Sequence, residues 1–233
     1  MTEAEEAPRL HKGGQVREPL VAGIFYPASA KELDDRIIRL LDKVDAPPGH
    51  CSAIISPHGS LEYSGSIAAR AWKAASAREI GTIIILSPSH RNFEPGIFLP
   101  QLHSFALPSG ELHVDRALVR ELIHSSTEIQ ANDIPHFEEH SIEMQLVFAT
   151  RLYPSALILP VIVGSCEAKT LDSLLANLHF LLGDRIASTL FVLTSNLAVD
   201  VNPDACLGKS AGILEAIEQK DTEALGEFSE DSS

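Results

Sequence analysis

The sequence predicts an α/β protein in which one sheet is covered by helices on both faces, a three-layer α/β/α sandwich. Residues 53–55 and 82–86 are short apolar or β-branched runs without alternating polar residues, which is typical of strands buried on both sides. Between such runs, apolar residues recur three or four positions apart and indicate amphipathic helices. The chain has 233 residues, of which 45% are hydrophobic. That length suffices for one domain with a substantial core.

The elements in the first half follow from apolar spacing and from proline and glycine. A first helix over 31–44 ends at Pro47-Pro48-Gly49, because proline cannot continue a helix. A second helix is expected after the first strand, with Ile67, Ala71 and Ala74 or Ala75 on one face. Trp72 and the alanines around it are expected to be helix-packing positions. Residues 91–114, rich in proline and glycine, are expected to be loop and edge strand.

The second half repeats the alternation of helices and strands. Asp115 is a good N-cap for a helix, and Ile142, Leu146, Ala149 and Tyr153 form the apolar stripe of a longer one. In chain order, the predicted elements are helix 31–44, strand 53–55, helix 64–77, strand 82–86, helix 115–124, helix 138–153, strand 157–163, helix 171–182, strand 189–193 and one or two helices over 207–225.

The two ends of the chain differ in composition from the part between them. Residues 1–16 are polar and are expected to be a disordered leader. Residues 227–233 form an acidic tail that is expected to be frayed. The residues between, 17–226, are predicted to form a single domain.

Charge and cysteine usage exclude several classes of function. The chain has 18 Lys and Arg against 32 Asp and Glu, a formal charge of −14, so neither nucleic acid nor an anionic membrane is expected as a partner. No apolar run is long enough to span a bilayer, and the acidic N-terminus is unlike a signal peptide. Three cysteines without a CxxC motif fit a reducing compartment. A cytoplasmic location is therefore expected.

Two strands end in nearly the same way, each followed by a histidine. Ile-Ile-Ser-Pro leads to His58, and Ile-Leu-Ser-Pro-Ser leads to His90. In open α/β sheets, ligands bind beyond the carboxyl ends of the strands. We therefore expect His58 and His90 to share a pocket at the ends of neighbouring parallel strands, as metal ligands or as an acid/base pair.

A second polar group lies at the start of the predicted helix 138–153. His140 and Glu143 are three residues apart, so they share a helix face and are expected to face the same pocket. Glu138 and Glu139 are interpreted as solvated acids placed against the helix dipole. His136 to His140 also match the H-x-x-E-H pattern of zinc peptidases. Because Pro135 places the first histidine at or before the helix start, a zinc peptidase is the least favoured of three candidate functions.

Four segments together resemble one known family. They are residues 17–27, 57–65 (Pro-His-Gly-Ser-Leu-Glu-Tyr-Ser-Gly), 87–90 (Ser-Pro-Ser-His) and 139–145 (Glu-His-Ser-Ile-Glu-Met-Gln). They are similar, in the same order, to the motifs of the Memo-like family, also called AmmeMemoRadiSam system protein B. The resemblance implies an α/β/α fold related to the LigB-like extradiol dioxygenases. It also implies a metal, iron or copper, held at the positions of His58 and His90.

The sequence departs from that family at two pocket positions. Asn196 stands where the family has an aspartate, and Val199 where it has a histidine. An amide is a weaker metal ligand than a carboxylate, and valine is none. We therefore expect a degenerate pocket that binds metal weakly, in a binding or accessory module of a radical-SAM-associated system that takes a small molecule or peptide. The alternative is a metal-dependent oxidoreductase or hydrolase using His58, His90 and His140.

The resemblance also predicts how the protein associates. The family's last strands have no counterpart after Leu225, so apolar surface or a strand edge is expected to be open. Open edges and apolar patches favour association. We expect a homo-oligomer or a partner chain, unless the helices over 207–225 fold back and cover the surface.

Overall fold

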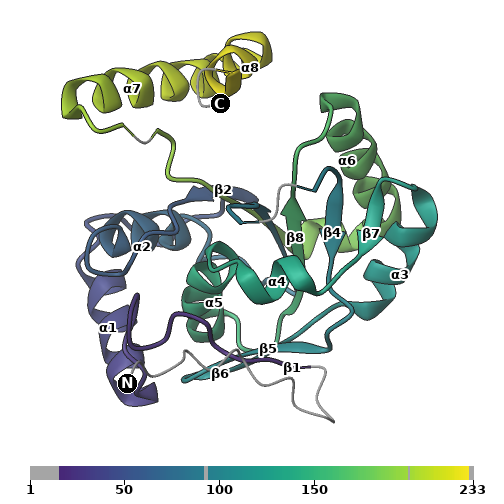
Figure 1. The fold of residues 1–233 in the computed structure, drawn as a ribbon. Helices are drawn as coiled ribbons and strands as arrows, with labels where there is room; N and C mark the ends of the chain where they lie inside the picture. The colour runs from purple at the N-terminus through teal and green to yellow at the C-terminus, as the bar shows by residue number, and fades with distance from the viewer. Residues whose placement is uncertain (1–15, 92–93, 199, 231–233) are drawn as a thin grey trace, which may run out of the picture.

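A mixed six-stranded sheet forms the centre of the molecule (Figure 1). The computed structural model describes residues 16–91, 94–198 and 200–230, with side chains as far as residue 226. The strand order is β2 (Ala53–Ser56), β9 (Thr189–Thr194), β3 (Thr82–Pro88), β8 (Leu157–Val163), β4 (Ile97–Leu99) and β7 (Ile129–Ala131). The first four are parallel, and β4 runs antiparallel to β8. The prediction of an α/β fold is confirmed.

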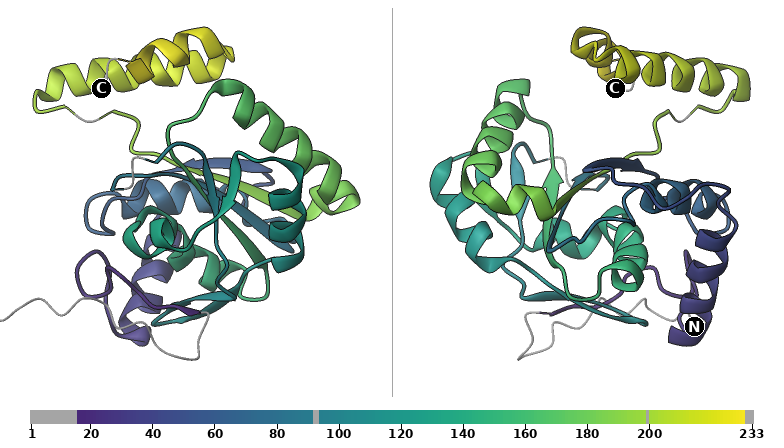
Figure 2. Two further views of the ribbon diagram at one scale, coloured as in Figure 1. Left: turned by 45° about the vertical axis from the view of Figure 1, so that its right-hand side comes forward. Right: turned by 180° about the vertical axis from the view of Figure 1, so that it is seen from behind.

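Helices lie on both sides of this sheet (Figures 1 and 2). On one side are α1 (Ala30–Asp42), α2 (Gly65–Lys73) and α5 (Ser141–Leu152), and on the other are α3 (Arg116–Ser125) and α6 (Ala168–Leu182). A short 3₁₀ helix, η1 (Gly183–Ser188), leads from α6 into β9. The inner strands β3 and β8 are almost wholly buried, which explains why their sequences lack polar alternation. The arrangement is consistent with the LigB-like fold that the resemblance implies.

A second, three-stranded sheet has the order β1 (Val16–Arg17), β5 (Ser104–Leu107), β6 (Gly110–His113). Within the predicted loop region 91–114, the structure therefore forms three strands rather than edge material alone. β4 in particular is fully buried and has a neighbour on each side. Three residues between glycine and proline give too short an apolar run to distinguish an inner strand from a loop.

The predicted helix 138–153 begins three residues later than expected, at Ser141, and a separate short helix precedes it. α4 (Ile134–Glu138) ends where Glu139 adopts extended backbone angles, φ −97° and ψ 133°, and α5 then begins at Ser141 with His140 as its N-cap. Pro135 lies in the first turn of α4, where a proline is tolerated because that turn has no intrahelical N–H bond to lose. The break turns Glu139 away from the direction that a continuous helix would give it.

The predicted core face of α2 is correct only in part, since Ala71 and Ala75 pack on the core but Ile67 does not. Ile67 is 62% exposed, whereas Ala68, Ala69 and Trp72 are buried. The stripe containing Trp72 buries far more apolar area than the stripe containing Ile67. Burial of a large aromatic side chain therefore determines which face of α2 packs on the core. The helix also ends at Lys73, before the predicted residue 77.

The C-terminal region forms two helices, α7 (Pro203–Gln219) and α8 (Thr222–Glu230), which stand away from the sheet in every view of Figures 1 and 2. They do not fold back over it. The first four residues of the predicted frayed tail are helical, while residues 231–233 lie outside the described residues, as do 1–15 of the predicted leader. In the described part of the chain, no helix has the length and apolar character needed to cross a membrane.

Candidate functional site

His58 and His90 lie side by side at the carboxyl edge of the main sheet. His58 follows β2 by two residues and His90 follows β3 by two, and their ring centroids are 5.0 Å apart. The prediction that these two strands are neighbours is wrong, because β9 lies between them. The rings still meet, since parallel strands all present their carboxyl ends at one edge.

His140 completes a triangle of imidazoles. Its ring centroid lies 5.8 Å from that of His58 and 5.6 Å from that of His90. Phe25 packs edge-on against it, with centroids 5.0 Å apart. The His58 side chain is buried, His140 is about three-quarters buried and His90 is half exposed. The cluster therefore opens to solvent on the His90 side.

Glu139 holds two of these histidines in place. Its Oε2 accepts hydrogen bonds from the backbone N–H of His90 (2.9 Å) and lies 2.9 Å from His90 Nδ1. Its Oε1 accepts from the backbone N–H groups of His140 (2.8 Å) and Ser141 (2.9 Å) and from Ser141 Oγ (2.7 Å). A carboxylate that binds one imidazole nitrogen leaves the other nitrogen to face the pocket. The prediction that Glu139 is a solvated acid at a helix start is wrong, because its side chain is buried. Its place in the segment that resembles the family was the signal that could have identified it.

Glu143 does not face the histidines, so that prediction is wrong. Its carboxylate forms a buried ion pair with Arg17 and accepts hydrogen bonds from the backbone N–H groups of Leu20 (2.8 Å) and Val21 (3.0 Å) and from the Tyr26 hydroxyl. Burial and this neighbouring carboxylate raise the pKa of Tyr26. Glu143 thus anchors the N-terminal segment to α5.

Arg17 links that anchor to the backbone around the site. Its Nε donates to the carbonyl oxygen of His136 (3.0 Å) and its Nη2 to that of Glu139 (2.8 Å). These bonds satisfy carbonyl groups at the break between α4 and α5, where the helical pattern is interrupted. The N-terminal segment therefore stabilises the turn from which Glu139 and His140 project.

His58 is fixed by a chain of polar side chains in the core. The Trp72 indole N–H donates to Gln145 Oε1 (3.1 Å), so Gln145 Nε2 is the end that donates to Thr194 Oγ1 (2.9 Å). Thr194 Oγ1 in turn lies 2.9 Å from His58 Nδ1. Asn196 Oδ1 accepts from the backbone N–H of His58 (3.0 Å). Val199, the other divergent position, lies outside the described residues.

Burial decides the protonation of the cluster. It lowers the pKa of His58 to about 4, with help from the positive charges of His90 and His140. It also lowers the pKa of His140, although the charge of Glu139 opposes this. Burial works against ionisation of Glu139, but the hydrogen bonds from Ser141 and His90 prevail and lower its pKa to about 2. At neutral pH, His58 and His140 are therefore neutral imidazoles and Glu139 is a carboxylate.

This set of donors fits a transition-metal ion. Ligand atoms of His90, Glu139 and His140 all lie within 4.8 Å of one another. His58 is not part of this set of converging ligand atoms, although its ring centroid lies 5.0 Å from that of His90 and 5.8 Å from that of His140. Neutral imidazole is the form that binds metal. Both oxygens of Glu139 already accept hydrogen bonds, so we assign it to orienting His90 rather than to binding the ion.

The zinc-peptidase reading of His136 to His140 is wrong. His136 lies in α4 and His140 precedes α5, whereas that pattern needs both in one helix. The His136 ring is buried against Phe105, with centroids 6.0 Å apart.

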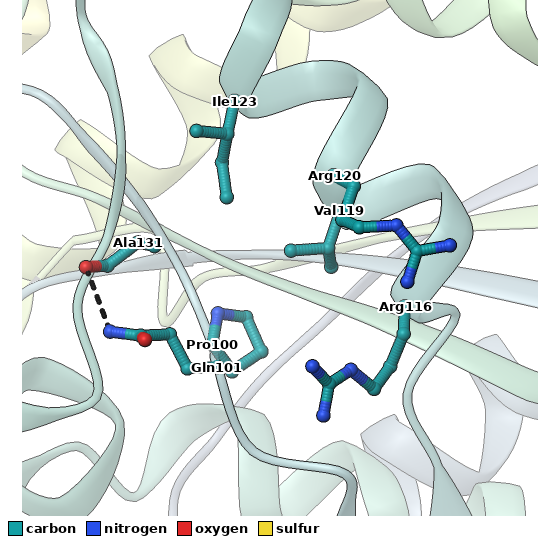
Figure 3. A pocket seen from close by; sticks show the side chains of 7 residues that line it. All are labelled: Pro100, Gln101, Arg116, Val119, Arg120, Ile123 and Ala131. Atoms are coloured by element: carbon teal, nitrogen blue, oxygen red, sulfur yellow. Dashed lines mark hydrogen bonds between the residues drawn. The ribbon is translucent and has the colours of Figure 1, made fainter.

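A separate hollow lies elsewhere in the molecule, beside α3 and the ends of β4 and β7 (Figure 3). Its volume is about 220 Å³, and none of the three clustered histidines lines it. The lining residues are Pro100, Gln101, Arg116, Val119, Arg120, Ile123 and Ala131.

Comparison with known proteins gives one consistent result. Residues 17–232 match the family described as Memo-like protein. A MEMO1 family protein of Thermotoga neapolitana is 29% identical over 230 residues, which cover 91% of this chain and 81% of that protein. A MEMO1 family protein of Methanococcoides burtonii is 30% identical over 66% of this chain and 57% of its own length. The protein memo-1 homolog of Caenorhabditis elegans is 34% identical over 66% of this chain, a stretch that spans less than half (44%) of the worm protein.

Proposed function

The chain belongs to the Memo-like protein family, and from that premise we propose that it is a binding protein whose three-histidine pocket takes up iron or copper weakly. The observation that carries this proposal is the triangle of His58, His90 and His140, with ring centroids 5.0 to 5.8 Å apart. Imidazole is the commonest protein ligand for such ions. His90 and His140 would provide the accessible nitrogens, and His58 the buried one.

Two features support weak binding rather than a tightly held catalytic ion. Both oxygens of Glu139 are engaged by backbone and side-chain donors, so a carboxylate ligand would have to be released from them. Asn196 provides a neutral amide, whose oxygen accepts from the His58 backbone. Non-haem iron sites usually combine histidines with a carboxylate. Without a carboxylate among the ligands themselves, three imidazoles do not offset the charge of the ion in its coordination sphere.

A metal-dependent oxidoreductase or hydrolase is the second candidate, favoured by the exposure of His90 to solvent. Three protein ligands leave coordination positions open, as catalytic sites do. A bound iron or copper ion would supply Lewis-acid or redox chemistry there. A small molecule or peptide could then approach from the His90 side. An accessory role beside a radical-SAM protein is part of the first proposal, and co-purification from the native host would test it.

Metal binding is tested by titration calorimetry with iron(II), under anaerobic conditions, and with copper(II). We expect weak one-to-one binding that is lost in His90→Ala and in His140→Ala. The matched control is His179→Ala, because His179 is exposed on α6 and plays no part in the cluster. Equal binding in all four proteins would overturn the proposal. Turnover of a candidate substrate by the metal-loaded protein, lost in His90→Ala, would favour the enzyme instead.

The Asn196 position provides a second test in the opposite direction. Asn196→Asp keeps an oxygen for the His58 backbone N–H and adds a negative charge beside the histidines. We expect tighter binding of iron(II), because the anionic group compensates the charge of the ion. If the unmodified protein binds tightly and the variant gains nothing, the pocket is not degenerate.

A further inference from the structure

One face of the sheet is open at β2 and β9. The register pairs Ala53 with Phe191 and Ile55 with Leu193, and we call these four residues the sheet strip. Ile55 is 39% exposed and Leu193 is 42% exposed. The residues that alternate with them in both strands are buried on the other face, toward α2 and α5. Adjacent apolar side chains on neighbouring strands make a continuous patch rather than scattered exposure.

Helix α7 carries a second open apolar surface. Leu207, Ala211 and Leu214 are four and three residues apart, so they lie along one side of the helix, and we call them the α7 stripe. Leu207 is 70% exposed and Leu214 is 47% exposed. Another side of α7 is already in use, since Ala216 is buried and the main contacts of α7 are with α8. A 17-residue helix is about 25 Å long, enough to cross the strands of the strip.

Local contacts hold the α7–α8 hairpin away from its own sheet (Figure 2). The segment between β9 and α7 is held by the bond from Cys206 Sγ to the carbonyl oxygen of Ala198 (3.5 Å) and by the ion pair of Lys209 with Asp200 (3.6 Å). Asn202 caps α7 by accepting from the N–H groups at its start. To cover its own strip, the hairpin would have to lose these contacts. A second molecule can meet the hairpin where it stands.

We propose that two copies of the chain associate by reciprocal docking, with the α7 stripe of each copy on the sheet strip of the other. Each chain carries both complementary surfaces. A two-fold axis therefore covers the two strips and the two stripes together, and no surface is left to bind a third copy. The charges near the two surfaces have opposite signs, which also favours a second copy as the partner. Residues 200–226 contain six carboxylates and two lysines. Arg78, at the start of the strip, donates only to the carbonyl oxygens of Cys51, Ala187 and Thr189 among the described residues.

The first test measures mass in solution by light scattering from low to high micromolar concentration. We expect a dimer, and monomers from L193K and from L207E, because each places a charge in both interfaces. Mixing the two variants should restore a dimer, since one interface then joins the new lysine to the new glutamate and the other is unchanged. I67E, on the exposed side of α2, is the control and should stay dimeric. A monomeric wild type, or a dimer indifferent to both variants, would overturn the proposal.

A second test leaves the residues of the sheet strip and of the α7 stripe unchanged. Cys51 is exposed just before β2, and Cys206 is half-buried beside Leu207 on α7. A short bismaleimide should join Cys51 of one chain to Cys206 of the other and give a covalent dimer. C51S and C206S should each abolish that product, whereas C166S should retain it. A Cys51–Cys206 link found only within single chains would show that the hairpin covers its own strip instead.

Discussion

At the scale of single residues, Glu139 determines how the pocket is built. Its two oxygens hold the backbone and ring of His90 and the backbone of His140. The residue lies where the chain leaves α4 and before it enters α5. One buried carboxylate therefore fixes two histidines that come from different parts of the sequence.

Glu139→Gln should loosen this arrangement. One carboxylate oxygen becomes an NH₂ group, which cannot accept the bonds that converge there, so at least one buried donor is left without a partner. We expect a loss of about 1–3 kcal/mol in the free energy of unfolding and roughly 10- to 100-fold weaker metal binding. Denaturant unfolding and calorimetry measure the two effects. Glu138→Gln, at the exposed neighbour, is the control, and equal behaviour of the two variants would contradict the assignment.

The sequence allowed His58 and His90 to be predicted because a local pattern, a buried strand followed by Ser-Pro, places each at the same edge. Glu143 was misassigned because its partner Arg17 is 126 residues away, and no local spacing reveals such a contact. The same limit concealed Glu139. Its neighbours suggested a solvated helix start, and only the break between α4 and α5 turns it inward.

At the scale of elements, apolar spacing predicted most helices and strands, but it did not decide which side of a short helix is buried. In α2, two apolar stripes compete, one with Ile67 and one with Trp72. The Trp72 ring is packed between Phe148 and Tyr153. Contacts with α5 and the segment after it therefore orient α2, and these are not visible in the sequence of α2 itself.

Two substitutions in α2 should have very different effects. Ile67→Glu changes an exposed side chain and should alter the free energy of unfolding by less than about 0.5 kcal/mol. Trp72→Ala empties a fully buried site and removes the N–H that orients Gln145, so we expect a loss of about 3–5 kcal/mol. Denaturant unfolding of both variants provides the measurement. Similar losses would mean that the packing of α2 has been misread.

At the scale of the whole molecule, a buried ion pair connects the three-stranded sheet to α5 and to the break between α4 and α5. The Arg17–Glu143 pair is fully buried and joins the N-terminal strand to α5. Removing one partner of such a pair leaves an uncompensated charge, which is typically far more costly than removing both. The stability of the protein therefore depends on which of these groups are charged, and so on pH.

His136 should make the protein less stable in acid. Its ring is buried, and neither nitrogen has a hydrogen-bond partner among the described residues. Burial lowers its pKa to about 3 from an ordinary 6.5, although the nearby Phe98 backbone opposes this. Between those values the unfolded chain binds a proton that the folded protein excludes. Titration of His136 therefore leaves the free energy of unfolding unchanged above pH 6.5 and lowers it as the pH falls toward 3.

Replacing His136 should remove its share of this acid sensitivity. A proton excluded on folding costs up to about 1.4 kcal/mol per pH unit, and His58, with its pKa of about 4, adds a similar slope. In His136→Phe, denaturant unfolding between pH 6.5 and 4.5 should show a slope reduced by about half a proton at the upper end and by nearly one proton at the lower end, while His179→Ala keeps the wild-type slope. Glu139 adds to the slope only near the lower end of that window, where the unfolded carboxyl of ordinary pKa 4.5 begins to bind a proton, and it adds equally in wild type and variant. An unchanged slope in His136→Phe would mean that the buried ring accepts a proton without cost.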